Sequence, residues 1–227
     1  MKENRLVVGI PSGNTWETGF AMSLLFMTNQ LVAHHYINGK PTMLRVHNKR
    51  GSILPQLRHN IIKEALKGNA THVLFIDSDQ TFPADLAHRL MAHQKQVVAC
   101  NIATKGFPSY PTARKDDGSR VGELVYTTED KKGLEEVWMV GCGVMLIDLN
   151  IFKRPELKNG PWFDISWNEE TDDYRGEDWF FCERLREAGV KIWVDHDVSW
   201  EVGHIGKMEY AHDLVELSHQ RRKGDAA

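Results

Sequence analysis

The stretch Thr71-His72-Val73-Leu74-Phe75-Ile76-Asp77-Ser78-Asp79-Gln80 decides the fold of this chain. The continuous apolar run at 73–76, bounded by polar residues, predicts a short strand that is buried on both faces of a sheet. Because side chains alternate along a strand, we expect Asp77 and Asp79 to point in the same direction where the strand ends. In an open α/β sheet, this carboxyl edge is where ligands bind.

Two carboxylates directed into one small volume repel each other unless a cation lies between them. The pair therefore predicts a site for Mg²⁺ or Mn²⁺, which bind carboxylate oxygens and share the metal with substrate phosphates. The alternative is that Asp77-Ser78-Asp79 caps the helix expected after Pro83. A motif this short does not decide between the two interpretations.

Strands and helices alternate on both sides of this stretch. Apolar runs predict strands at 6–10, 43–47 and 97–101, and helices are expected at 17–36, 55–67 and from Pro83 to about 94. The polar segment 48–52 is expected to be a loop. This alternation is typical of β-α-β units, so we predict a mostly parallel sheet with helices on both faces.

The alternation changes in the second part of the chain. We expect a long loop over 105–118, antiparallel strands at 122–127 and 135–140, a strand at 144–147 and an irregular loop over 155–173. A helix is expected over 176–188, a strand over 191–194 and a final helix over 208–222. The fold class is therefore α/β with a small antiparallel portion, and the absence of linkers and repeats predicts a single domain over residues 1–227.

Composition limits the function classes. The 227 residues carry a formal net charge of −3, which gives no footprint for tight, non-specific nucleic-acid binding but does not exclude a local basic groove. The three cysteines are too few for a disulfide framework and are expected to pack as small apolar residues in a reducing compartment. The segment 20–36 is interrupted by polar residues, so we expect no membrane insertion and a cytoplasmic protein.

Several motifs occur together with the Asp77–Asp79 pair. They are Pro11-Ser12-Gly13, Arg58-His59-Asn60, Gly141-Cys142-Gly143, Gly176-Glu177-Asp178 and Val202-Gly203-His204-Ile205. In this order and spacing, over nearly the whole chain, the sequence resembles the GT-A nucleotide-sugar glycosyltransferases, in particular the family 2-like enzymes of bacteria and phages. The resemblance implies a Rossmann-like GT-A domain with a nucleotide-binding half at 1–101 and an acceptor-binding half at 102–227.

The resemblance implies a metal site and a donor site. Asp77, Asp79 and His204 would hold Mn²⁺ or Mg²⁺ against the diphosphate of the donor, with Asp77 facing either the metal or the ribose. The alternative for His204 is a turn histidine bonded to the backbone. The other residues that the resemblance places against the donor are Pro11, Ser12, Gly13, Arg58, Ser78 and Gly143. The alternative for Arg58 is an exposed helix arginine.

The resemblance also implies catalytic residues. Asp178 would deprotonate the acceptor hydroxyl, and Glu177 would hydrogen-bond a sugar. The alternative is that both acids have no catalytic role and only stabilise the helix, because negative charge is favourable at a helix N-terminus. Which of the two is the base stays open here. The sequence Tyr174-Arg175 before Gly176 departs from the longer Trp-Gly-Glu-Asp signature of the fold. An acceptor wall is expected from Trp162, Phe163, Trp167 and Trp179, with core packing as its alternative.

The expected activity is a metal-dependent, inverting hexosyltransferase that uses a UDP-sugar. The acceptor class stays open among polysaccharides, lipid-linked glycans, proteins and hydroxymethylated bases in phage DNA, and the expected location is the cytoplasm of a bacterial cell or a phage-infected host. Two alternatives stay open: a nucleotidyltransferase on a related α/β sheet, and a non-catalytic module that binds a sugar or a metal. The segment 11–16 lacks the basic residue that the first alternative favours. The sequence does not indicate an oligomeric state.

Overall fold

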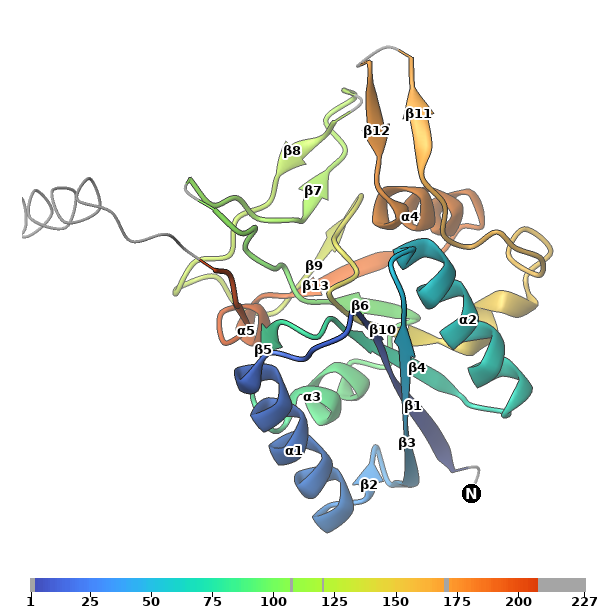
Figure 1. Cartoon of the computed structure of the whole chain (residues 1–227), viewed down its shortest axis with the longest axis vertical. Helices are drawn as coiled ribbons and strands as arrows, with labels where there is room; N and C mark the ends of the chain where they lie inside the picture. Colours follow the sequence, from blue (N-terminus) through green and yellow to red (C-terminus); the bar gives the residue numbers. More distant parts are fainter. Residues whose placement is uncertain (1–2, 107, 120, 170–171, 208–227) are drawn as a thin grey trace, which may run out of the picture.

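The computed structural model describes residues 3–106, 108–119, 121–169 and 172–207. An eight-stranded sheet with the strand order β2-β3-β1-β4-β10-β6-β13-β9 forms the centre of the molecule (Figure 1). Its strands, in that order, are Tyr36–Ile37, Lys40–Arg50, Asn4–Ser12, His72–Ile76, Val144–Asp148, Val97–Ala99, Ile192–Asp195 and Leu134–Val137. The last part of the chain thus contributes strands to the same sheet as the first part.

The sheet is mixed. Strand β1 pairs in parallel with both β3 and β4, and β13 pairs in parallel with β6. Strand β10 lies between β4 and β6 and is antiparallel to both, and β9 is an antiparallel edge strand. The predicted α/β class, with a small antiparallel portion, is confirmed.

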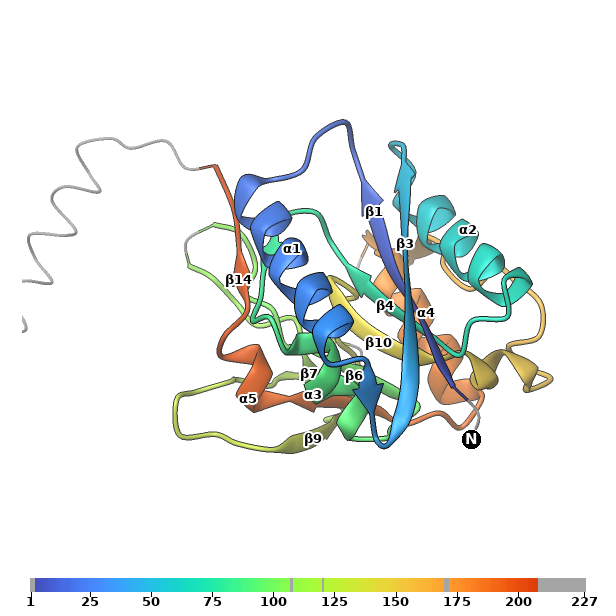
Figure 2. The same cartoon turned by 90° about the horizontal axis from the view of Figure 1, so that it is seen from below.

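Helices cover both faces of the sheet. Figure 2 shows α1 (Thr18–Ala33) and α3 (Leu86–Ala92) on one side of the strands, and α2 (Leu54–Lys67) and α4 (Glu177–Glu187) on the other. Strand β4 contributes side chains to a hydrophobic core on each face of the sheet. Val73 and Phe75 pack with the residues under α2 and α4. Leu74 and Ile76 pack with those under α1 and α3. The expectation of a strand buried on both faces is therefore confirmed.

Short elements surround this framework. They are η1 (Leu149–Lys153) and α5 (His196–Ser199), with the strand pairs β5 (Gln80–Thr81) and β14 (Gly203–His204), β7 (Arg114–Lys115) and β8 (Glu123–Leu124), and β11 (Ser166–Asn168) and β12 (Asp173–Arg175). The β7–β8 and β11–β12 hairpins project from the side of the sheet where β1 and β3 end (Figure 1). The expected loop over 155–173 therefore contains β11 and the first residue of β12.

Several expected boundaries were wrong. Strand β3 continues to Arg50, opposite Ser12 of β1, so most of the expected loop at 48–52 is strand. The helix after Pro83 begins at Leu86 with Asp85 at its N-cap, so the Asp77–Asp79 segment does not cap it. The predicted helix at 208–222 lies outside the described residues. In the described part of the chain, none of the helices has the length and apolarity needed to cross a bilayer.

Candidate active site

A cavity of about 220 Å³ opens where β1, β3 and β4 end. Because these strands are parallel neighbours, their carboxyl ends meet at one edge of the sheet. The cavity is lined by Pro11, Ser12, Gly13, Gly51, Ser52, Leu54, Leu57, Asp77, Ser78, Asp79 and His204. The structure thus brings together the predicted nucleoside pocket, the Asp77–Asp79 segment and the distant histidine.

Asp79 and His204 meet in this cavity because β14 pairs with β5. Ile205 N donates to the Asp79 carbonyl at 2.8 Å, and His204 Nε2 lies 3.6 Å from Asp79 Oδ2. The ammonium of Lys105 contacts the same carboxylate oxygen. Burial acts to raise the pKa of Asp79, but the contacts with His204 and Lys105 outweigh it and lower the pKa to about 2. Asp79 is therefore ionised at neutral pH.

His204 is bonded to the backbone, as the alternative interpretation of this residue expects, and its second ring nitrogen faces Asp79. Its Nδ1 lies 2.8 Å from the carbonyl oxygen of Ala103, which can only accept a hydrogen bond, so Nδ1 carries the proton. The hydrogen bond to Asp79 raises the pKa of His204, so without a cation Nε2 is favoured to carry a proton toward Asp79, and a metal bound there would replace that proton. Among the residues that the structure describes, no three or more His, Cys, Asp or Glu side chains are grouped to hold a metal. A divalent cation here would have two protein ligands and take its other ligands from phosphate and water, as Mg²⁺ commonly does.

Asp77 has a different partner, the buried Arg58 of α2. Only 2% of the Arg58 side chain is exposed, and its Nη2 donates to both carboxylate oxygens of Asp77 at 2.9 and 3.1 Å. Arg58 Nε donates to Glu177 at 3.3 Å, and Nη1 donates to the Cys142 carbonyl at the same distance. Burial alone would lower the pKa of Arg58, but Asp77 and Glu177 raise it above its ordinary value. Arg58 is not an exposed helix arginine; it joins the end of β4 to the start of α4.

The two carboxylates of the central motif therefore have separate partners, although both line the cavity. Strand β4 ends at Ile76, and the chain then turns, with Gln80 N donating to the Asp77 carbonyl at 3.2 Å. The side-chain alternation that predicted a common direction does not continue through a turn.

Glu177 and Asp178 occupy the first turn of α4, where the helix dipole also favours acidic residues. Asp178 Oδ1 accepts a hydrogen bond from the Trp179 amide at 2.8 Å. Burial raises the pKa of Asp178, and the neighbouring charge of Glu177 raises it further. A carboxylate whose pKa is shifted toward neutrality is suited to exchange a proton with a substrate.

Gly143 contacts Asp77 directly. Its carbonyl accepts a hydrogen bond from the Asp77 amide at 2.8 Å. A Cβ on Gly143 would lie 2.8 Å from Ile102 Cδ1 and 3.2 Å from Asp77 Oδ2. The missing side chain thus leaves room for the Asp77 carboxylate and for Ile102.

The four aromatic residues expected to form an acceptor wall have different surroundings. Trp162 and Phe163 are buried in the core under α2 and α4. Trp179 is half-buried and packs edge-to-face on Trp138, with ring centroids 5.4 Å apart. Trp167 on β11 exposes 50% of its surface. Trp167 is thus the member of this set that is free to contact a ligand.

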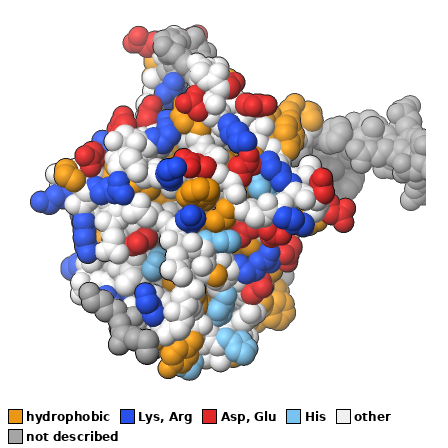
Figure 3. All heavy atoms as spheres, turned by 180° about the vertical axis from the view of Figure 1, so that it is seen from behind, with side chains coloured by type: hydrophobic (Ala, Val, Ile, Leu, Met, Phe, Trp, Pro, Cys, Tyr) orange, Lys and Arg blue, Asp and Glu red, His pale blue; other side chains and the backbone are white. Residues whose placement is uncertain are grey.

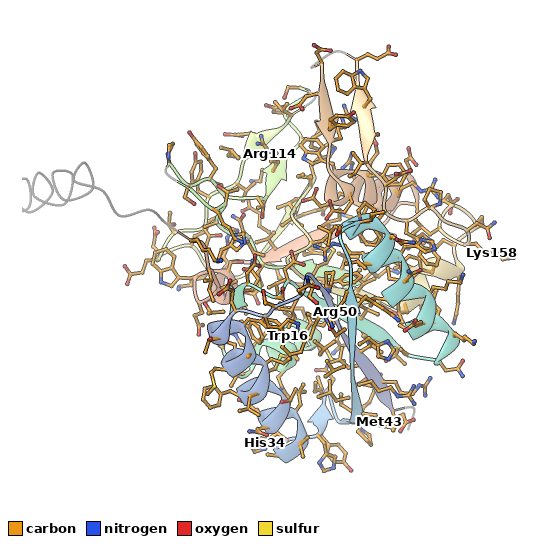
Figure 4. The ribbon with its side chains drawn as sticks, in the orientation of Figure 1. Trp16, His34, Met43, Arg50, Arg114 and Lys158 are labelled. Atoms are coloured by element: carbon orange, nitrogen blue, oxygen red, sulfur yellow. The ribbon has the colours of Figure 1, made fainter. Side chains whose placement is uncertain are left out.

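Two groups of residues that lie at or next to the cavity were not assigned to it from the sequence. Gly51 and Ser52 line it, and the preceding Arg50 lies at the end of β3 (Figure 4). The polar segment that follows a predicted parallel strand could have identified these residues, because such segments lie at the ligand-binding edge of a sheet. The contact between Lys105 and Asp79 had no local signal, because the loop that carries Lys105 returns to β4 only in the folded chain.

Comparison with known proteins supports the fold. No protein-family profile matches the chain, and no curated protein matches it in sequence. Among solved structures, the catalytic domain of Drosophila beta1,4-galactosyltransferase 7, in complex with xylobiose, is similar with a TM-score of 0.51 and 14% identity, over 90% of this chain and 71% of that one. Protein A197 from STIV is similar with a TM-score of 0.47 and 15% identity, over 92% of this chain and 100% of that one. The similarity to the galactosyltransferase domain shows a glycosyltransferase-like fold.

Proposed function

We propose that the chain is a metal-dependent, inverting glycosyltransferase that moves a hexose from a UDP-sugar to a hydroxyl acceptor. The observation that carries this proposal is the cavity at the ends of β1, β3 and β4, where Asp79 and His204 face each other at 3.6 Å. Two protein ligands beside an open cavity fit a cation that is completed by the phosphates of a bound nucleotide. The glycosyltransferase-like fold supports the same function.

The donor side is assigned to the cavity. Pro11, Ser12 and Gly13 would contact the nucleoside, while Asp79 and His204 would hold Mn²⁺ or Mg²⁺ at the diphosphate. The metal, when bound, stabilises the negative charge that develops on the departing diphosphate. Arg50 and Lys105 are basic residues at or next to the cavity, and they add positive charge for the same phosphates.

Asp178 is assigned as the general base. As the acceptor oxygen bonds to the anomeric carbon, the bond from that carbon to the diphosphate oxygen breaks, and the hydroxyl proton passes to the Asp178 carboxylate. Arg58 holds Glu177 beside Asp178 and holds Asp77 at the cavity, so it fixes the spacing of the donor and acceptor sides. Glu177 also raises the pKa of Asp178 through its charge.

The experiment is a thermal-unfolding screen of the full chain with UDP-sugars, with and without Mn²⁺. A ligand present at 100 times its Kd stabilises the native state by about 2.7 kcal/mol. For a chain of this size, that raises the Tm by about 5–10 °C. We expect the shift to require Mn²⁺ and to be lost in Asp79→Asn. Asp85→Asn, at a surface ion pair with Arg89, is the matched control and should retain the shift.

The outcomes separate the alternatives. Equal shifts with and without Mn²⁺ would remove the metal from the proposal, and the absence of a shift with every UDP-sugar would remove the donor class. A UDP-sugar that binds but is never turned over with any acceptor would favour a binding module.

A further inference from the structure

We propose that the β11–β12 hairpin binds the acceptor, and that this acceptor is a neutral glycan whose pyranose ring stacks on Trp167 and Tyr174. The proposal rests on the proposed function and names its acceptor class. The two residues face each other across the hairpin, with ring centroids 5.0 Å apart at an interplanar angle of 76°. Trp167 is 50% exposed and Tyr174 is 70% exposed.

The position of the hairpin follows from the chain itself. Strand β12 ends at Arg175, and only Gly176 separates it from α4, which carries Glu177 and Asp178 in its first turn. Tyr174 therefore precedes the proposed base, Asp178, by only four positions in the chain. Figure 1 shows the hairpin projecting from the start of α4, on the side of the sheet where β1 and β3 end.

Arg175 fixes the hairpin to α4. Its guanidinium carbon lies 5.9 Å from the ring centroid of Trp179, and its Nη1 lies 3.7 Å from Glu183 Oε1. Both contacts link the last residue of β12 to side chains of the helix. These contacts link the hairpin that carries the aromatic pair to the helix that carries Asp178.

The chemistry of the pair fits a sugar. An aromatic ring offers an apolar face with negative quadrupole potential, which favours contact with the weakly positive C–H face of a pyranose. The cross-strand contact between the two rings also stabilises the hairpin, yet half of Trp167 and 70% of Tyr174 stay exposed for a ligand. Large exposed apolar side chains that gather at one place mark a binding surface.

The charge around the pair excludes a polyanion. The segment 161–175 contains five acidic residues and one basic residue, Arg175, which is directed to Glu183 and Trp179 of α4. Four of the acids are exposed in the described structure, namely Asp164, Glu169, Asp172 and Asp173. Nucleic acids are bound through cationic contacts to their phosphates, so an acidic hairpin repels DNA. On the face drawn in Figure 3, the described acidic and basic side chains are intermingled rather than sorted into one basic surface. The acceptor is therefore a neutral glycan rather than a modified base in DNA.

The test uses the labelled full-length chain on an array of neutral glycans, anionic glycans and duplex DNA containing hydroxymethylated bases. We expect binding to at least one neutral glycan. The double variant Trp167→Ala/Tyr174→Ala should lose that binding by tenfold or more, whereas Trp167→Phe should retain part of it. Trp200→Ala removes another exposed aromatic residue, outside the hairpin, and should bind as the wild type does.

Each outcome bears on the proposal. Binding to DNA or to anionic glycans alone, no glycan binding at all, or equal binding by the double variant would overturn it. Circular dichroism and the Mn²⁺-dependent thermal shift with UDP-sugars are measured on the same variants, which should match the wild type because the hairpin lies outside the donor cavity. If glycan binding follows the prediction but the wild type shows no UDP-sugar shift, the proposed function fails and the acceptor surface stands.

Discussion

Arg58 and Asp77 form a two-pronged ion pair, in which one guanidinium nitrogen lies 2.9 Å from Oδ1 and 3.1 Å from Oδ2 of the carboxylate. The same guanidinium reaches Glu177, so a single buried cation holds acids from β4 and α4 together. Breaking a buried ion pair from one side costs far more than breaking a surface pair, because an uncompensated charge stays behind.

We therefore predict that Arg58→Met destabilises the fold by about 3–5 kcal/mol. Arg58→Lys should also destabilise it, because an ammonium cannot serve two carboxylates and a carbonyl with the geometry of a guanidinium fork. The measurement is urea unfolding. The control is Arg89→Met at a more exposed pair with Glu201, for which we expect a loss of about 1 kcal/mol or less. Equal losses of unfolding free energy in the two variants would show that the buried pairs of Arg58 contribute no more to stability than the more exposed pair of Arg89.

Asp178→Asn should abolish sugar transfer while leaving donor binding unchanged, because an amide cannot accept the acceptor proton. Calorimetry with the UDP-sugar identified by thermal unfolding measures the binding, and product formation measures the transfer. The residue lies outside the donor cavity, so its charge is not needed there. Full transfer by this variant would remove Asp178 as the base.

The pH dependence should follow from the raised pKa of Asp178. A base must be ionised to act, so kcat/KM should fall on the acid side at a pH above the ordinary range of an aspartate, because burial and Glu177 raise this pKa. Glu177→Gln removes the neighbouring negative charge that helps to raise the pKa of Asp178, so the acid-side fall of kcat/KM should move to lower pH. A fall that stays in place, or moves to higher pH, would contradict the assignment.

Gly143→Ala should destabilise the fold by about 1–3 kcal/mol through overpacking. The added Cβ would lie 2.8 Å from Ile102 Cδ1 and 3.2 Å from Asp77 Oδ2, so both side chains must shift. Gly13→Ala is the control, because a Cβ added at Gly13 would meet no other atom within 4 Å. We expect that substitution to leave the unfolding free energy within about 1 kcal/mol of the wild type. A neutral Gly143→Ala would show that Ile102 and Asp77 can move without cost.

Acid stability should depend on Glu135 of β9. Burial acts to raise the pKa of Glu135, but contacts with Lys115, Lys131 and His196 lower it to about 2. A carboxylate whose pKa is lower in the folded state stabilises the fold at pH values above its unfolded-state pKa, here about 4.5. This contribution is lost as the pH falls toward the folded-state pKa of about 2. Glu135→Gln should flatten the fall of the unfolding free energy over that interval.

The control for that prediction is Glu136→Gln on the same strand, whose ion pair with Lys191 is exposed. Urea unfolding at a series of pH values measures both variants. We expect the Glu136 variant to follow the wild-type pH dependence. The same slope in the Glu135 variant as in the wild type would contradict the predicted role of its contacts.

The sequence by itself determined the strand at 72–76, its burial on both faces and the location of the cavity. Side-chain periodicity encodes burial locally, and the run from Val73 to Ile76 alternates between the two cores as its composition predicted. The strand pattern placed Asp77 and Asp79 at the carboxyl edge of the sheet, whereas the assignment of 11–13 to the same site came from the family resemblance; both segments line the cavity.

Only the tertiary structure decided the partners of the charged residues. Arg58 and Glu177 are 119 positions apart, and neither has a local signal for the other. The antiparallel insertion of β10 between β4 and β6 was also not readable, because apolar strands of either direction have similar composition. Ion pairs and strand order depend on which surfaces meet when the chain folds, and that information is distributed over the whole sequence rather than carried by any one segment.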